Sequence, residues 1–264
     1  MRKLLVLLIT ILSIGIISCK KDNNEENNQI VPLDLNDVEA LSKVSENFLN
    51  KDNYYIETTG ETISQGIIKV HQYSWTVQIF DRSNYFYYYK ESVSKSSFKK
   101  TGDRRLFSSE GVYVDKAKTV EVKDGMVTNH TWENNKKLIT LEEHEKTYGF
   151  KVAGFVGYEL NSDTILSSSS NKQDDKIYYT FILDPDNATK DYKKEIAYYS
   201  DSNEITFTQV TLIVITYLDY NVLEVNVEES YKVKIPVLGY VNLLTKLHNK
   251  YYYDKDHSIE AFLF

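Results

Sequence analysis

The chain has 264 residues and a formal net charge of −7, and 42% of its residues are apolar and 13% aromatic. This apolar and aromatic content excludes intrinsic disorder, and the low glycine and proline counts, 10 and 3, exclude a collagen-like sequence. The acidic balance argues against a nucleic-acid partner, because nucleic-acid binding requires a basic surface.

Residues 1–18 have the features of a secretory signal peptide. Arg2 and Lys3 give a positive start, and residues 4–17 form an apolar run that is short of the roughly 20 residues needed to span a bilayer. The run ends in Ile16-Ile17-Ser18-Cys19, which resembles the lipobox of bacterial lipoproteins. The resemblance implies cleavage between Ser18 and Cys19 and acylation of Cys19.

Cys19 is the only cysteine, so the chain cannot form an intramolecular disulfide. The alternative to a lipoprotein is a plain secretory or signal-anchor segment with an incidental cysteine. Loss of Arg2 and Lys3 would change the net charge from −7 to −9, so the acyl chains, not anionic headgroups, would hold the protein at the membrane. We therefore expect a lipid anchor in the cell membrane or outer membrane, with the folded domain outside the cytoplasm.

Residues 19–32 form the lipidated cysteine and a flexible tether, because they are polar and lack any apolar period. Thirteen such residues reach roughly 20 Å. Residues 33–264 are expected to form a single β-rich globular domain.

The domain begins with a predicted helix over 34–50, in which apolar residues recur at helical spacing and Asp34 is placed to cap the N-terminus. Segments rich in Tyr, Thr, Val, Ile and Phe follow and favour strands. Asp124-Gly125 is typical of a tight hairpin turn. We predict strands over 54–63, 67–80, 85–94, 111–116, 119–123 and 126–132.

The middle of the chain alternates helices and strands. Thr140 to Glu143 resembles a capping box, and Gly149 is placed to end the short helix that follows. We predict a strand over 150–160, a flexible loop over the serine-rich residues 167–175 and a strand over 176–183. A second internal helix is predicted from Pro185 to about Tyr199.

The clearest hairpin lies near the C-terminus. Residues 207–218 are apolar on both faces, which predicts a strand covered on both sides, and residues 219–221 form the turn. From Val225 to Ile235 apolar and polar residues alternate, interrupted by Glu229, which predicts one buried and one wet face. Closing strands are expected over 251–253 and 259–264.

These elements predict an α+β, β-rich fold: a curved, mostly antiparallel sheet, half-open and barrel-like, with an N-terminal helix and two short internal helices packed on one face. This order of elements resembles the LolA/LolB/LppX-type lipoproteins. The resemblance implies a half-open β-barrel whose concave apolar face holds lipid or acyl chains under helices that act as a lid. A lipocalin-like barrel or another sheet-and-helix scaffold is the alternative.

The sequence contains no catalytic motif. Glycine-rich phosphate loops, a nucleophile elbow and zinc-binding spacing are absent, and the five histidines are scattered. The segment Asp184-Pro185-Asp186-Asn187 fits a turn and helix cap better than a calcium loop. We therefore predict no catalytic residue, no metal site and no cofactor.

Tyrosine is in excess, with 22 residues. It is either a strand former with a hydroxyl that reaches a partner, or the lining of an aromatic cavity or platform. Tyr85 to Tyr89 place aromatic side chains on both faces of one strand. The predicted ligand-binding residues are Tyr85, Tyr87, Tyr89, Val225, Val227 and Tyr231.

Three hypotheses of function follow. The first is a monomeric, non-enzymatic, membrane-anchored lipoprotein that binds a lipid, an acyl chain or an envelope partner in the concave face of its sheet. The second is a surface module that binds glycan or protein through exposed tyrosines. The third is an envelope hydrolase, which requires a cleft with paired carboxylates or a His–carboxylate pair.

Overall fold

The computed structural model describes residues 33–65, 71–81, 87–96, 99–148, 155–196, 205–235 and 239–253. The predicted signal peptide and tether, and the closing strand expected over 259–264, lie outside the described residues. Lipidation of Cys19 and the division of the chain into three parts therefore stay predictions.

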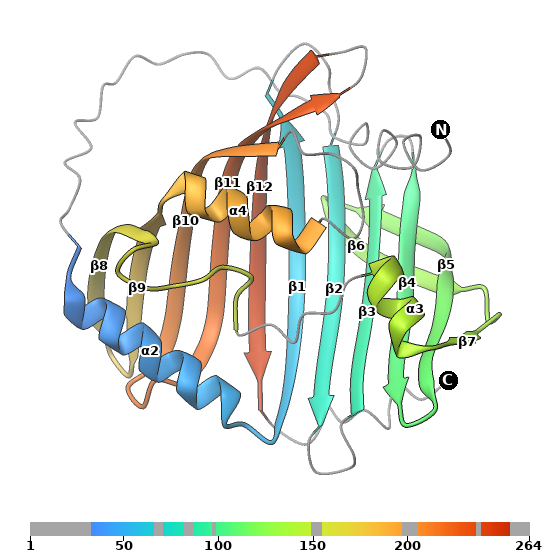
Figure 1. The fold of residues 1–264 in the computed structure, drawn as a ribbon, viewed down its shortest axis with the longest axis horizontal. Coiled ribbons are helices and arrows are strands. Elements are labelled where there is room, and N and C mark those ends of the chain that lie inside the picture. Colours follow the sequence, from blue (N-terminus) through green and yellow to red (C-terminus); the bar gives the residue numbers. More distant parts are fainter. Residues whose placement is uncertain are drawn as a thin grey trace.

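The described chain forms one open, curved antiparallel sheet of 12 strands in the order β6-β5-β4-β3-β2-β1-β12-β11-β10-β9-β8, with β7 paired to β5 (Figure 1). Two meanders, β1 to β6 and β8 to β12, run outward in opposite directions from the pairing of β1 with β12. The strands are β1 (Asn53–Ser64), β2 (His71–Asp81), β3 (Tyr87–Ser96), β4 (Lys100–Ser108), β5 (Gly111–Lys123), β6 (Met126–Trp132), β7 (Lys137–Ile139), β8 (Ile165–Gln173), β9 (Lys176–Leu183), β10 (Ile205–Tyr217), β11 (Val222–Ile235) and β12 (Gly239–Tyr252).

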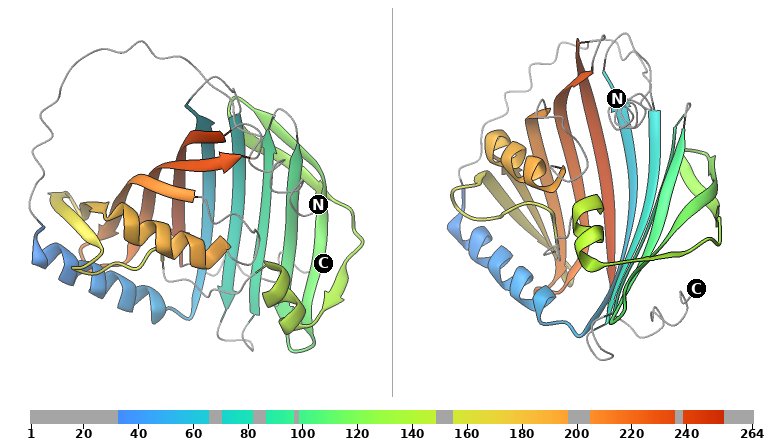
Figure 2. Two further views of the ribbon diagram at one scale, coloured as in Figure 1. Left: turned by 45° about the horizontal axis from the view of Figure 1, so that its top comes forward. Right: turned by 45° about the vertical axis from the view of Figure 1, so that its right-hand side comes forward.

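The helices α2 (Leu35–Leu49), α3 (Leu141–Tyr148) and α4 (Pro185–Ile196) all lie on one face of the sheet (Figure 2). We call this the helix face and the opposite one the outer face, over which the β5–β6 hairpin folds (Figures 1 and 2). The predicted fold class is thus confirmed, including the placement of the helices on one face.

The helix α2 forms where the sequence predicts it. Asp34 caps it by accepting a hydrogen bond from the Asn36 amide, 2.8 Å away. Its buried apolar residues recur three or four positions apart, which places them on one side of the helix. They are Ala40, Leu41, Val44 and Phe48, and they pack into the main core.

The two faces of the sheet carry separate cores. On the helix face, the main core lies between α2, α4 and the strands β1 and β8 to β12; it contains the fully buried Phe181, Leu212 and Val225. On the outer face, a smaller cluster is formed by Val77 and Ile79 of β2, Tyr89 of β3 and Leu106 of β4. Because neighbouring residues of a strand point to opposite faces, the sheet contributes to both cores.

The β5–β6 hairpin bends over the outer face because β5 changes partner along its length. Its first half pairs with β4 and its second half with β6, so the two strands predicted over 111–116 and 119–123 are one strand. The turn is the predicted one, since Asp124 and Gly125 both have positive φ, 50° and 77°. His130 of β6 contacts Glu91 of β3 and fastens the hairpin to the sheet.

Three predictions of local structure were wrong. The serine-rich segment expected to be a loop over 167–175 is a strand over 167–173, within β8, because each of these residues pairs with one of β9. Ser168 is buried at the start of α2, where its hydroxyl accepts from the Asp34 amide. The segment predicted as a strand over 150–160 contains bends, not a strand, in its described part, 155–160. The strand β10 is covered on the helix face alone, and Ile213 and Tyr217 are exposed.

The sequence pattern also predicted fewer and shorter strands than the structure contains. Strands β4 and β7 were not predicted, and β12 is much longer than the segment expected over 251–253. Both β4 and β12 are central strands with many polar side chains, so their apolar pattern is weak. Pairing on both edges, not composition, makes them strands.

Candidate functional site

Three of the predicted ligand-binding residues, Val225, Val227 and Tyr231, lie side by side on the helix face of β11. They belong to the main core: Val225 is fully buried, and the Tyr231 ring lies 5.2 Å from that of Phe207 and 6.4 Å from that of Tyr192 on α4. Burial raises the pKa of Tyr231, so its hydroxyl stays neutral. A ligand would contact these residues only after displacing part of the core.

The predicted tyrosines lie elsewhere. Tyr89 is buried in the outer-face cluster, where its hydroxyl donates to Glu91. Tyr87 lies in β3 by its backbone, and Tyr85 lies outside the described residues. The structure therefore does not bring Tyr89 to the three residues of β11, and ligand binding by this set stays a prediction.

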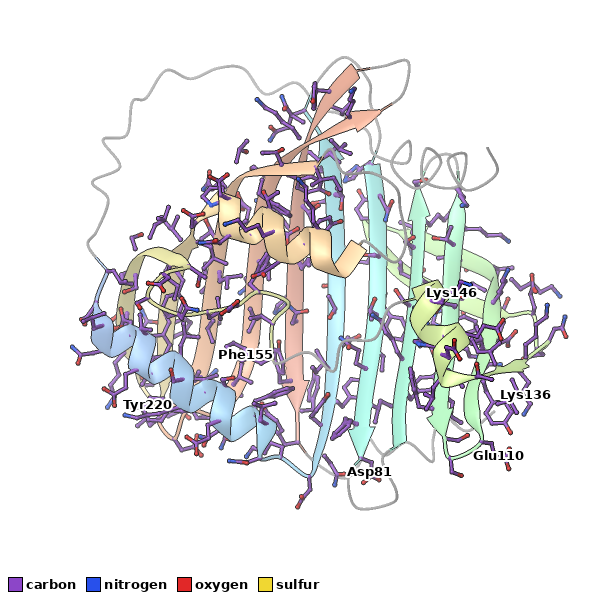
Figure 3. The ribbon with its side chains drawn as sticks, viewed as in Figure 1. Asp81, Glu110, Lys136, Lys146, Phe155 and Tyr220 are labelled. Carbon is purple, nitrogen blue, oxygen red and sulfur yellow. The ribbon has the colours of Figure 1, made fainter. Side chains whose placement is uncertain are left out.

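The helix face carries a pocket that the sequence did not suggest. It has a volume of about 500 Å³ and lies between α2 and residues 155–160. We call it the α2 pocket. Figure 3 shows Phe155 between α2 and α4. Apolar side chains supply much of its wall, and polar groups of α2 complete it; the lining is Leu41, Ser42, Ser45, Glu46, Leu49, Asn50, Phe155, Val156, Tyr158 and Leu160.

One wall of the α2 pocket, residues 155–160, is held at three points. The Tyr251 hydroxyl donates to the Phe155 carbonyl, the Tyr158 hydroxyl donates to Glu229, and the Glu159 amide donates to the buried Asp191 of α4 at 3.0 Å. Glu229 interrupts the apolar pattern of β11, and the bond from Tyr158 explains why a carboxylate is tolerated there. These bonds fix a segment that has no regular secondary structure.

The other wall, α2, is fastened at both ends. The Asp34 amide donates to Ser168 at 2.9 Å, and the Asn47 amide group donates to the Asp219 carbonyl at 2.7 Å. Near the C-terminus of α2, the Phe48 ring packs against three others: the ring centroids of Tyr54, Phe155 and Tyr251 lie 4.7, 6.5 and 6.0 Å away. The pocket therefore lies directly beside this aromatic cluster.

Two buried tyrosines of the main core, Tyr251 and Tyr179, do not line the α2 pocket and are uncharged. Burial strongly raises the pKa of Tyr251, and burial together with the nearby Tyr220 and Asp37 raises the pKa of Tyr179 to about 12. Both hydroxyls are therefore neutral at physiological pH. On the α2 wall of the pocket, the polar side chains of Ser42, Glu46 and Asn50 are exposed to solvent.

Three His–carboxylate pairs lie on the outer face. His71 contacts Glu61 at 2.5 Å, His248 contacts Glu224 at 2.8 Å, and His130 contacts Glu91. The hydroxyl of Tyr73 lies 3.1 Å from His71, but burial and Glu61 raise the pKa of this tyrosine, which weakens it as a nucleophile. Within the described ranges, His, Cys, Asp and Glu form no group of three or more that could hold a metal ion.

Comparison with known proteins gives likeness of fold only. No family model matches the chain, and no curated protein sequence matches it. Among solved structures, LprF from Mycobacterium bovis is similar, with 8% identity, coverage of 82% of this chain and 93% of that one, and a TM-score of 0.38.

Two further solved structures are similar. A LolA superfamily protein from Nitrosomonas europaea has 12% identity, coverage of 83% and 98%, and a TM-score of 0.24. A DUF1329 family protein from Desulfovibrio piger has 9% identity, coverage of 88% and 98%, and a TM-score of 0.28. Because all three TM-scores lie below 0.5, the function proposed below rests on the geometry of this chain.

In the part of the chain that the structure describes, no helix has the length and apolar character needed to cross a bilayer.

Proposed function

We propose that this protein is a lipid-anchored envelope lipoprotein that binds one apolar chain, such as an acyl chain of a lipid, in the α2 pocket. The observation that carries the proposal is the pocket itself. Its volume of about 500 Å³ falls in the range of roughly 300–1,000 Å³ that is usual for small-molecule sites. Its apolar wall would remove an acyl chain from water, and each buried methylene group would stabilise the complex by roughly 0.8 kcal/mol.

The arrangement of the pocket suits an amphipathic ligand. Leu49, Val156 and Leu160 offer accessible apolar surface, whereas Ser42 and Glu46 lie at the solvent side of α2. A lipid would place its chain beside the aromatic cluster and its polar end at this rim. The position of the pocket, on α2 rather than at Val225, Val227 and Tyr231, leaves the main core intact on binding.

Membrane attachment is the second part of the proposal. The predicted lipid anchor at Cys19 precedes α2 by a short tether of roughly 20 Å reach. The α2 pocket would therefore stay close to the bilayer from which a lipid could enter. Deletion of the acylation site by Cys19→Ser should release the protein from the membrane fraction.

Exposed tyrosines give little support to the alternative of an aromatic binding platform. Of the tyrosines that the structure describes, Tyr217 and Tyr240 are the ones with large exposed fractions, 41% and 66%. Tyr217 ends β10 next to the turn into β11, whereas Tyr240 pairs with Lys234 at the opposite end of β11. They lie at opposite ends of the sheet and form no common surface.

The test compares the full chain with two variants purified in the same detergent. Ser45→Trp fills the α2 pocket from one wall, and Glu39→Trp adds the same side chain to an exposed position of α2 that does not line the pocket. Native mass spectrometry and organic extraction measure bound lipid. We expect at least about a fivefold loss of bound lipid in Ser45→Trp and no loss in Glu39→Trp. Equal lipid in both variants, or a lipid-free wild-type protein, would contradict the proposal.

A further inference from the structure

A second hollow lies on the outer face, on the other side of the sheet from the α2 pocket. It has a volume of about 530 Å³ and lies between the tip of the β5–β6 hairpin, Asp124 to Val127, and the strands β1, β2, β10, β11 and β12. We call it the outer groove. The hairpin tip is held over the sheet near Tyr73, whose ring lies close to Gly125. Nothing in the proposed lipid-binding function uses this groove.

The floor of the outer groove consists of two rows of side chains that cross the strands. Strand pairing aligns Ile213, Asn226, His248 and Thr59 in one row. The neighbouring row contains Thr211, Glu228, Lys246 and Glu61. Residues directly opposite each other in a sheet share a face, so these side chains present donors and acceptors at fixed spacings of about 5 Å.

The charged side chains on the floor of the outer groove have partners within the protein, whereas Asp124 lines the groove from the hairpin tip. Lys246 contacts Glu228 at 2.9 Å, His248 contacts Glu224 at 2.8 Å and Glu61 contacts His71 at 2.5 Å. Both signs of charge therefore alternate along the floor, and no single-sign patch selects an ion. A ligand that suits this floor is neutral and carries both donors and acceptors.

Two polar side chains of the first row, Asn226 on β11 and Thr59 at the β1 end, are available to such a ligand. Asn226 and Thr59 make no side-chain hydrogen bond to any residue in the described part of the chain. Apolar surface lies beside them: Met126 at the hairpin tip is 59% exposed and Ile213 on the floor is 36% exposed. The groove thus pairs a hydrogen-bonding floor with small apolar walls.

We propose that the outer groove binds a neutral carbohydrate, as a mono- or disaccharide unit of a larger glycan. Sugar hydroxyls donate and accept at once, which matches the amide of Asn226 and the paired charges around it. The C–H face of a sugar ring would pack on Met126 and Ile213. This site is separate from the α2 pocket and does not depend on the function proposed above.

The experiment titrates neutral oligosaccharides of glucose, galactose, mannose and N-acetylglucosamine into the full chain in detergent, observed by ligand NMR. Asn226→Trp fills the groove, and Ser230→Trp places the same side chain on the same face of β11 outside the groove lining. At least one neutral sugar should bind; we expect Asn226→Trp to weaken it by about tenfold or more and Ser230→Trp by less than about twofold.

Further variants identify the chemistry of the ligand. The double variant Glu228→Gln/Lys246→Gln removes an ion pair but keeps the hydrogen-bonding groups, so sugar binding should change by less than about threefold. Tetralysine and a sulfated disaccharide serve as charged probes and should bind more weakly than the neutral sugar. If Asn226→Trp proves unstable, Met126→Asp at the exposed hairpin tip should weaken the sugar by about threefold or more.

The proposal is overturned if none of the four neutral sugars binds at about 10 mM. It is also overturned if binding is unaffected by Asn226→Trp in a folded protein, or if a charged probe binds best and the double variant abolishes it. Ser45→Trp, which fills the α2 pocket, should leave sugar binding unchanged. Failure of one proposal is thereby distinguished from failure of the other.

Discussion

Asp115 is a buried carboxylate that joins β4, β5 and the segment after β6. It accepts hydrogen bonds from Arg104 at 2.8 Å and from the amides of Lys116, Asn134 and Asn135. Burial alone would raise the pKa of Asp115, but Arg104 and the amide donors outweigh it and lower the pKa below its usual value. The ionised form is therefore the one that stabilises the folded state.

We predict that Asp115→Ala lowers the free energy of unfolding by about 3 kcal/mol, because Arg104 and three amides lose their acceptor. Urea denaturation at pH 7 measures the change. The exposed Asp175, in the turn between β8 and β9, provides the control, and Asp175→Ala should cost less than about 0.5 kcal/mol. Equal costs for the two variants would show that the Asp115 network contributes no stability.

His144 of α3 gives a second prediction, on pH. It is 2% exposed and lies against Phe107 and Arg105; burial, then the Arg105 charge, lower its pKa to about 4. An unfolded histidine takes up its proton near pH 6.5, but the folded one does so near pH 4. The stability that neutral His144 contributes is complete above pH 6.5 and is lost as the pH falls through this interval.

His144→Leu should therefore reduce the loss of stability between pH 7 and pH 4.5, measured as the shift of the urea midpoint. Leu138→Ala, which changes an exposed side chain without a titratable group, serves as the control and should keep the pH profile of the wild type. A His144→Leu profile as steep as that of the wild type would show that other groups carry the acid sensitivity.

At the scale of single residues, the sequence predicts what depends on nearest neighbours. The Asp34 cap and the Asp124-Gly125 turn were predicted because each is a local hydrogen-bond or φ preference. The burial of Tyr89 was not predictable, since its ring packs against Val77 and Ile79 of β2 and Leu106 of β4, which pairing brings to β3. The residues of the α2 pocket were missed for the same reason: Leu41 and Phe155 meet only in the folded protein.

The β5–β6 hairpin is the element on which the outer groove depends. Gly125 has a φ of 77°, and a Cβ at this position would lie 3.3 Å from the Tyr73 ring. Gly239 has nearly the same φ, 78°, but a Cβ there would meet nothing within 4 Å. Substitution of Gly239 therefore tests backbone strain alone, whereas substitution of Gly125 tests strain together with contact with the sheet.

We expect Gly239→Ala to cost about 1 kcal/mol, from backbone strain alone, and Gly125→Ala to cost more, because its methyl group also presses on Tyr73. Thermal unfolding followed by circular dichroism measures both. Gly125→Ala should also weaken sugar binding, since it shifts the wall of the outer groove. Identical unfolding temperatures for the two variants would mean that the hairpin tip does not press on the sheet.

At the scale of elements, the sequence predicts amphipathic segments well and polar strands poorly. The α2 helix and the β10–β11 hairpin carry clear apolar periods and were found. The β8 strand, with Ser167 to Ser170, carries none, and β9 makes it a strand by pairing. The buried Ser168 lies where α2 begins, a place for a small side chain that cannot be read from the strand itself.

The part of the chain that the structure describes is built on a single sheet with different chemistry on each side. The helix face is closed by α2 and α4 and carries the α2 pocket, whereas the outer face is partly covered by the β5–β6 hairpin and carries the outer groove. Strands β11 and β12 form part of the groove floor and, through Glu229 and Tyr251, hold the wall of the pocket. The two sites thus share strands, but neither site depends on a side-chain contact with the other.

This arrangement predicts that the two sites bind independently. Strands pair with both edges of β11 and β12 and hold the backbone between the two sites in one register. A ligand in one site therefore has no second conformation of the sheet to stabilise, and it cannot change the affinity of the other site. The sugar affinity of lipid-loaded and delipidated protein should agree within about twofold, which corresponds to a coupling free energy below about 0.4 kcal/mol. Calorimetric titration of the two preparations measures it, and Ser45→Trp serves as a permanently lipid-poor control. A difference of about tenfold in sugar affinity would show instead that the sheet changes conformation between the lipid-loaded and the delipidated state. Bound lipid would then regulate sugar binding.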